Sequence, residues 1–196
     1  MPRKLELHPD RLLPPDPAVR AIARELYASV KDLPIVSPHG HCDPEWFATD
    51  APFGNASELL LVPDHYLFRM LYSQGVRLED LGVGNSDADP RKAWRILAEN
   101  YYLFRGTPSR IWLDWVFAEA FGIEFRLEAE TADLYFDTIT EALQTEAFRP
   151  RALFERYNIE ALATTESPLD PLAHHRAIRE ANDSGGWSGK VVTAYR

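Results

Sequence analysis

The sequence predicts a parallel α/β fold with a large helical insertion after its first strand. Short segments of β-strand character occur at residues 34–36, 159–165 and 190–195. A helical pattern joins the second segment to the third, and largely helical periodicity fills the chain between the first and the second. Strands that alternate with helices in this way are typical of a parallel sheet with crossover helices.

The first predicted element is a helix that begins at Asp16-Pro17, an N-cap followed by proline at the first helical position. The helix presents one apolar face at helical spacing. That face consists of Val19, Ile22, Ala23, Leu26, Tyr27 and Val30. A short buried strand is expected at residues 34–36, and it leads into the segment Ser37-Pro38-His39-Gly40-His41.

Helices are expected almost throughout residues 58–157. One begins at Asp89-Pro90, one at Thr107-Pro108, one near Thr131 and a short one after Pro150. The second of these has little polar surface, so we expect burial on most sides. Its apolar residues are Ile111, Trp112, Leu113, Trp115, Val116, Phe117 and Phe121.

Strand and helix alternation resumes at residue 159. After the strand at 159–165, Ser167-Pro168 resembles an N-cap with proline at N1, and a helix is expected from there to about Ala181. We therefore expect three regions. Residues 1–57 carry the first helix and strand, residues 58–157 form the helical insertion, and residues 158–196 hold the second and third strands.

Three strands form neither a closed barrel nor a well-protected open sheet. We therefore expect the chain to be a fragment of a larger α/β fold.

The composition excludes some functional classes. A net charge of −9 disfavours binding to a nucleic acid backbone, which depends on Lys and Arg, so we expect no nucleic acid partner. No apolar run is long enough for a membrane span and the N-terminus lacks the apolar region of a signal peptide, so we expect no membrane association. The single cysteine, Cys42, agrees with a reducing compartment, and we expect the protein in the cytoplasm.

The pair His39 and His41 is the main candidate for chemistry. Residues two apart on a strand project the same way, so both imidazoles can bind one metal ion. A catalytic zinc site has about three protein ligands, and active sites of α/β barrels lie at the carboxyl ends of the strands. The alternative is a pair of loop histidines. Cys42 is expected to pack on the opposite face and not to be a third ligand. Asp43 and Glu45 either add a carboxylate ligand or, as we expect, support the site or cap a helix.

Polar residues elsewhere are weaker candidates. His65 and Tyr66 lie in the first turn of a helix that Asp64 can cap, where they either face a ligand or line the core. Arg196, at the end of the third strand, has the donor fork that binds carboxylates. We expect Arg69 to be solvated, and Glu166 to contact a ligand or cap a helix. His174 and His175 are expected at the surface. Gly82-Val83-Gly84 lacks the third glycine of a dinucleotide-binding motif, so no phosphate loop is expected there.

Five motifs, in this order along the chain, resemble the uronate isomerase (glucuronate isomerase) family of the amidohydrolase superfamily. The resemblance runs from about Leu5 to Arg196 and covers less than half of a usual family chain. The motifs are Ser37-Pro-His-Gly-His-Cys-Asp43, Asp64-His-Tyr-Leu-Phe-Arg-Met70, Thr164-Thr-Glu-Ser-Pro-Leu-Asp170, Ala173-His-His-Arg176 and Thr193-Ala-Tyr-Arg196.

The resemblance implies a distorted (β/α)8 barrel and the isomerisation of D-glucuronate to D-fructuronate and of D-galacturonate to D-tagaturonate. It implies that His39 and His41 bind a divalent metal, expected to be zinc, and that His65, Tyr66 and Arg196 contact the substrate. Tyr66 is the candidate for proton transfer or for stabilising developing negative charge. The family's further aspartate ligand, from the last barrel strand, is absent here. We also expect a homo-oligomer, and no activity from the 196 residues alone.

Two other functions stay open at the level of sequence. One is a metal-dependent hydrolase of the same superfamily, in which the ion generates hydroxide. The other is a non-enzymatic interaction module built from the helical region.

Overall fold

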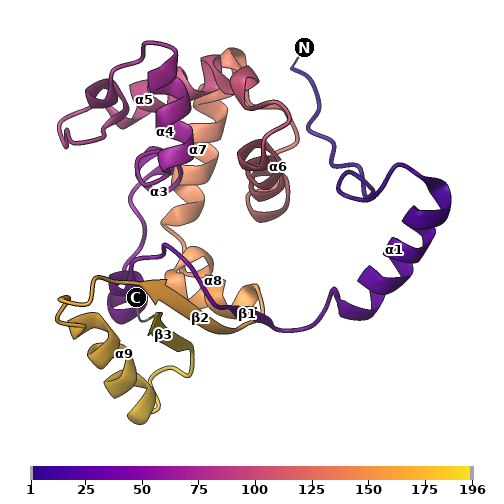
Figure 1. The fold of residues 1–196 in the computed structure, drawn as a ribbon. Helices are drawn as coiled ribbons and strands as arrows, with labels where there is room; N and C mark the ends of the chain where they lie inside the picture. The colour runs from indigo at the N-terminus through magenta and orange to yellow at the C-terminus, as the bar shows by residue number, and fades with distance from the viewer. Residues whose placement is uncertain (1, 195–196) are drawn as a thin grey trace. The chain divides into compact units, whose positions relative to one another are not determined.

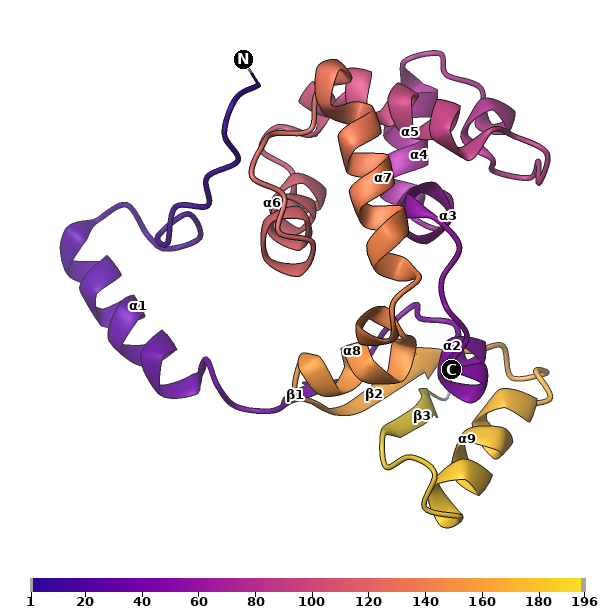
Figure 2. The same ribbon diagram turned by 180° about the vertical axis from the view of Figure 1, so that it is seen from behind.

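The computed structural model describes residues 2–194 and divides into two compact units (Figures 1 and 2). One unit contains the residues up to Arg11 together with Phe53–Gln144, and the other contains Leu12–Pro52 and the residues from Thr145 onward. The expected boundaries at residues 57 and 157 do not coincide with this division.

The second unit, the sheet unit, contains a three-stranded parallel sheet in the order β1-β2-β3, which confirms the predicted α/β class. The strands are β1 (Ile35–Ser37), β2 (Ile159–Thr165) and β3 (Lys190–Ala194). In the register of β2 and β3, Leu162 lies beside Val191. The helices α2 to α8 all lie between β1 and β2 in the sequence, as expected for an insertion after the first strand.

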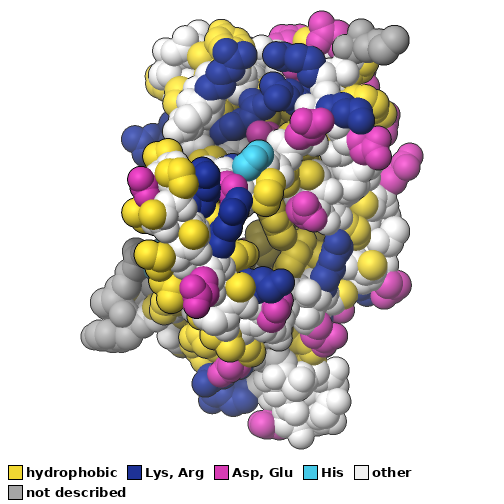
Figure 3. All heavy atoms as spheres, turned by 90° about the vertical axis from the view of Figure 1, so that its right-hand side faces the viewer, with side chains coloured by type: hydrophobic (Ala, Val, Ile, Leu, Met, Phe, Trp, Pro, Cys, Tyr) yellow, Lys and Arg dark blue, Asp and Glu magenta, His cyan; other side chains and the backbone are white. Residues whose placement is uncertain are grey.

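In the described part of the sheet unit the α-helices are α1 (Pro17–Val30), α2 (Pro44–Thr49), α8 (Pro150–Arg156) and α9 (Ala173–Asp183). The predicted start of α1 is confirmed, since the Asp16 carboxylate accepts a hydrogen bond from the backbone N–H of Val19. No residue of α1 is buried, so its apolar face is exposed. Figure 3 views the side of Figure 1 on which α1 is drawn and shows hydrophobic side chains at that surface among charged ones.

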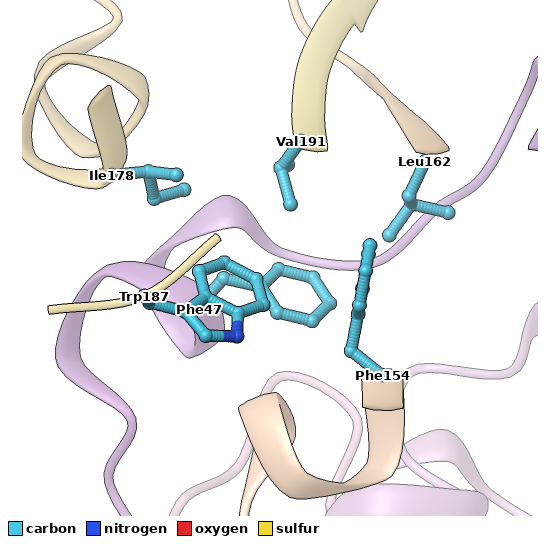
Figure 4. Close-up of a cluster of buried hydrophobic side chains, with 6 residues drawn as sticks. All are labelled: Phe47, Phe154, Leu162, Ile178, Trp187 and Val191. Atoms are coloured by element: carbon cyan, nitrogen blue, oxygen red, sulfur yellow. The ribbon is translucent and has the colours of Figure 1, made fainter. Parts of the chain in front are cut away.

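The core of the sheet unit is a cluster of six side chains from α2, α8, α9, β2, β3 and the loop before β3 (Figure 4). The Phe47 and Trp187 rings stack in parallel with centroids 5.9 Å apart, and Phe154 meets Trp187 edge to face at 5.2 Å. Leu162, Val191 and Ile178 complete the cluster. These contacts hold the three helices on one face of the sheet.

The prediction that the first strand is buried is wrong for this chain. Ile35 and Val36 of β1 are 49% and 59% exposed. The reason is that β1 has only three residues, pairs with β2 alone among the described strands, and contributes no side chain to the core cluster.

The predicted start of the helix before the third strand is also wrong. Residues 167–170 form a turn that two hydrogen bonds close. The Ser167 N–H donates to the Asp170 carboxylate at 2.7 Å, and the Asp170 N–H donates to the Ser167 carbonyl. Pro171 disfavours helical backbone at the residue before it. Leu172 then takes a left-handed conformation with φ of 53°, and α9 begins only at Ala173.

The first unit, the helical unit, contains α3 (Ala56–Leu60), α4 (His65–Ser73), α5 (Pro90–Glu99), α6 (Pro108–Trp115) and α7 (Ala132–Leu143). The predicted N-caps are confirmed, with side chains that accept hydrogen bonds from the first-turn backbone of α4, α5 and α6. Among residues 2–194, no helix has both the length and the apolar character needed to cross a membrane.

The prediction that α6 is buried on most sides is wrong. Leu113 and Phe117, four residues apart, are fully buried, whereas Ile111, Trp112 and Trp115 each keep more than a third of their surface exposed. Residues four apart lie on one helix face, so only that face enters the core. A π-helical turn at Val116–Ala120 then continues the helix.

A partly buried cluster of three polar side chains links α6 to the preceding turn. The Tyr101 hydroxyl donates to Asp114 Oδ1 at 3.0 Å, and Arg110 donates to Asp114 Oδ2 at 2.8 Å while its guanidinium lies 3.9 Å from the Tyr101 ring centroid. Burial raises the pKa of Tyr101, so its hydroxyl remains a donor at neutral pH. Each oxygen of the Asp114 carboxylate therefore accepts one hydrogen bond, from Tyr101 and from Arg110.

Tyr101→Phe is expected to lower the free energy of unfolding by about 1.5–3 kcal/mol, the usual value of a hydrogen bond to a charged group. Urea unfolding of the variant measures this loss. The neighbouring Tyr102 is exposed, so Tyr102→Phe is a matched control with an expected change of less than about 0.5 kcal/mol. Equal losses in the two variants would contradict the role of the Tyr101 hydroxyl.

Candidate metal and substrate site

The two histidines of the His-x-His segment converge directly after β1. His39 Nε2 and His41 Nε2 lie 3.0 Å apart, and the two rings meet edge to face with centroids at 4.9 Å. Both residues belong to the sheet unit and follow the carboxyl end of its first strand. The structure thus brings this predicted pair together.

The separation of the two nitrogens suits a shared metal ion. Imidazole ligands bind zinc at about 2.0–2.1 Å, and two such ligands at angles of about 90–110° lie about 2.9–3.4 Å apart. The distance of 3.0 Å lies within this range. Among the described residues there is no group of three or more His, Cys, Asp and Glu arranged for a metal ion.

Hydrogen bonds hold His39 from two sides. The Ser37 hydroxyl donates to the His39 carbonyl at 3.1 Å. At the end of β2, Thr165 Oγ1 lies 3.4 Å from His39 Nδ1 and donates to the Gly40 carbonyl at 2.9 Å. The first and second strands are therefore tied together at the histidine pair.

A pocket of about 650 Å³ lies beside His41 within the sheet unit. Thr165 and Glu166 at the end of β2 line it, together with the first residues of α2 and the segment that leads into α9. Asp43 is a helix cap, since its carboxylate accepts from the Glu45 N–H at 2.9 Å at the start of α2. This pocket leaves His41 accessible to a small molecule.

The prediction for Cys42 is confirmed. Its side chain is partly buried and packs against the core cluster of the sheet unit. Burial raises the pKa of the Cys42 thiol, so the thiolate that a metal binds is disfavoured.

The predicted surface position of His175 is wrong. His175 is only 7% exposed, its Nε2 lies 2.8 Å from Thr164 Oγ1, and Glu166 Oε1 is 3.7 Å away. The signal for this burial was present in the sequence, because His175 lies three residues before the buried Ile178 and so shares its helix face. Glu166 accepts a hydrogen bond from Thr193 and does not cap α9.

His65 and Tyr66 lie at the start of α4 in the helical unit. Asp64 caps the helix by accepting from the Tyr66 N–H at 2.8 Å, and the two aromatic rings are 4.2 Å apart. Tyr66 is 68% exposed, so it does not line the core, which receives Leu67 and Leu71 from this helix. Arg196 lies outside the described residues.

The comparison with protein-family models decides the family. The model described as glucuronate isomerase matches residues 18–196, which is most of the chain. The chain belongs to the glucuronate isomerase family.

Relatives in this family are similar along the whole chain. A uronate isomerase of Sphingopyxis alaskensis is 70% identical over 196 residues, and one of Phenylobacterium zucineum is 68% identical over 200 residues. Both alignments cover 100% of this chain but only 42% and 41% of the relatives. The chain therefore spans about two fifths of the length of these glucuronate isomerase family members.

Solved structures of the family have the same fold over this region. The crystal structure of glucuronate isomerase from Caulobacter crescentus has a TM-score of 0.94 and 63% sequence identity, and covers 99% of this chain and 40% of that one. The uronate isomerase of Thermotoga maritima is 28% identical with a TM-score of 0.79, and covers 90% of this chain and 37% of that one.

Proposed function

We propose that this chain forms part of a uronate isomerase that converts D-glucuronate to D-fructuronate and D-galacturonate to D-tagaturonate in hexuronate catabolism. The observation that carries the proposal is the 3.0 Å approach of His39 Nε2 and His41 Nε2 at the carboxyl end of β1, in a chain of the glucuronate isomerase family. The proposed activity is that of a protein with the relatives' full length.

We propose that His39 and His41 hold a divalent metal ion, zinc in the first instance. The support is the donor chemistry, since neutral imidazoles at this separation suit zinc geometry. When bound, such an ion supplies Lewis acidity that polarises the oxygens of the reacting sugar carbons. The two histidines fix where that acidity acts.

The reaction itself moves hydrogen and releases nothing. The C2 proton of the aldose is removed and a proton is delivered to C1, while the hydroxyl proton on O2 is lost and O1 is protonated, so that the carbonyl moves from C1 to C2. We assign Tyr66 to this proton transfer or to a hydrogen bond to the oxygen that gains negative charge. His65 and Arg196 are assigned to substrate binding, and the guanidinium of Arg196 suits the uronate carboxylate.

A substrate panel tests the proposed function. With a protein of the relatives' full length, we expect D-glucuronate and D-galacturonate to give keturonates that chromatography detects. Esters and lactones in the same panel test the alternative of a metal-dependent hydrolase. Hydrolysis of these compounds without uronate turnover would overturn the proposal.

Tyr66→Phe is expected to lower kcat for D-glucuronate by about 10²–10⁴-fold, the usual contribution of a positioned proton donor or acceptor. The bound metal content should stay unchanged because Tyr66 is not an assigned ligand. Tyr72→Phe is the matched control, since Tyr72 lies in the same helix and is also exposed, and we expect it to retain the wild-type kcat. Equal rates for wild type and Tyr66→Phe would remove Tyr66 from the mechanism.

We also propose that the protein acts in the cytoplasm as a homo-oligomer. The single cysteine of this chain supports a reducing compartment. Light scattering coupled to gel filtration measures the oligomeric state, and a monomeric mass would contradict the proposal.

A further inference from the structure

We propose that Thr165 is a positioning residue that holds the metal ligand His39 in the tautomer with its Nε2 lone pair available. This inference rests on the metal site of the proposed function and adds a residue from the second strand to it. Thr165 and His39 are 126 residues apart in the sequence, so only the pairing of β1 with β2 brings them together.

The alternation of side chains along β2 places Thr165 on the side of His39. Thr164 is fully buried and lies against His175 of α9. Consecutive strand residues point to opposite faces, so Thr165 projects from the face opposite Thr164. Its hydroxyl reaches both Gly40 and His39, whereas the neighbouring hydroxyl of Thr164 reaches neither in the described structure.

The hydrogen-bond capacity of a hydroxyl determines the tautomer. A threonine hydroxyl has one proton to donate and two lone pairs to accept. Thr165 donates its proton to the Gly40 carbonyl at 2.9 Å, so toward His39 Nδ1, at 3.4 Å, it acts as an acceptor. His39 Nδ1 must then carry the proton, which leaves Nε2 unprotonated in the neutral ring.

The unprotonated nitrogen of His39 in this tautomer is the one that faces His41. His39 Nε2 is the atom that lies 3.0 Å from His41 Nε2. Groups that orient a metal-binding histidine through its other ring nitrogen typically change metal affinity by about 10–100-fold when removed. Threonine suits this task because its branched Cβ restricts χ1 and keeps the hydroxyl in place.

The test measures Zn²⁺ affinity by competition with a chromophoric chelator, in a protein of the relatives' full length. Thr165→Val keeps the shape but removes the hydroxyl, and we expect about 10–100-fold weaker binding. Thr165→Ser keeps the hydroxyl and should bind Zn²⁺ almost as well as wild type. Thr164→Val removes the adjacent hydroxyl on the opposite face and should leave the affinity unchanged, whatever it does to stability.

A second measurement separates the effect on His39 from an effect on the Gly40 turn. In the Co²⁺-substituted protein, the Nδ1 proton of a histidine bound through Nε2 gives a strongly shifted, exchangeable proton NMR signal. His39→Gln, measured at saturating Co²⁺, assigns that signal because this signal alone is lost while that of His41 remains. We expect exchange of the signal with solvent to accelerate in Thr165→Val and to stay slow in Thr165→Ser.

The outcomes decide between the possible explanations. Weaker Zn²⁺ binding by Thr165→Val with an unchanged exchange rate would place the effect in the Gly40 turn and overturn the inference. Unchanged affinity would overturn it as well, while the metal site itself stood. Wild-type protein that binds neither Zn²⁺ nor Co²⁺ would instead refute the proposed metal site. If Thr165→Val does not fold, the same comparison is made between Thr165→Ser and Thr165→Ala.

Discussion

His39→Ala is expected to abolish measurable uronate isomerisation in a protein of the relatives' full length, because it removes one of the two imidazoles that converge at 3.0 Å. Loss of a direct ligand should weaken Zn²⁺ binding by more than the roughly 10–100-fold that follows from loss of a supporting group. His41→Ala should have the same effect. Metal content by elemental analysis and turnover of D-glucuronate measure the two losses.

His8→Ala is the control for the loss of a histidine. His8 belongs to the helical unit, where its Nδ1 accepts a hydrogen bond from the Asp10 N–H, and it has no role in the proposed site. The control should keep both metal and turnover. Retained turnover in His39→Ala would count strongly against the metal role of the His-x-His pair.

Trp187→Ala is expected to lower the free energy of unfolding by about 3–5 kcal/mol, the range for removing a large aromatic side chain from a core. Trp187 stacks on Phe47, meets Phe154 edge to face, and donates from Nε1 to Glu155 at 3.2 Å. Its loss would leave a cavity among Phe47 of α2, Phe154 of α8 and the strands β2 and β3. This core packs against β2, which carries Thr165 of the candidate site. Urea unfolding followed by fluorescence measures the change.

Trp112→Ala is the matched control, since Trp112 is 40% exposed and lies on the outer face of α6. We expect a loss of less than about 1 kcal/mol for this variant. A second variant, Gly189→Ala, tests the same core, because a Cβ at Gly189 would lie 2.0 Å from the Trp187 ring and displace it. Similar losses for Trp187→Ala and Trp112→Ala would contradict the central place of Trp187.

Local signals in the sequence predicted most of the helices and strands. The caps at Asp16, Asp64, Asp89 and Thr107 are confirmed, since each side chain accepts a hydrogen bond from the first turn of its helix. Such bonds join residues two or three apart, so they depend on the immediate sequence alone. The predicted start of α9 at Ser167 is wrong, because Ser167 and Asp170 form a turn instead of an N-cap. Pro171 follows this turn, and the helix begins only at Ala173.

Burial was harder to predict than secondary structure. The apolar residues of α1 and β1 are exposed here, as is one side of α6, whereas His175 is buried against β2. Periodicity identifies which residues share a face but not whether another element covers that face. The covering elements come from distant parts of the sequence.

Residue patterns alone predicted the parallel α/β class, the helical insertion, the family resemblance and the pair of histidines. The strand period predicted that His39 and His41 lie together, and the structure brings them together after the end of β1, in irregular backbone. Only the tertiary structure brought Thr165 to His39 and His175 to Thr164, because these contacts depend on how β2 pairs with β1 and how α9 packs on the sheet. Non-local pairing leaves no periodic signal in the sequence, and for that reason the support of the candidate site became visible only in the folded chain.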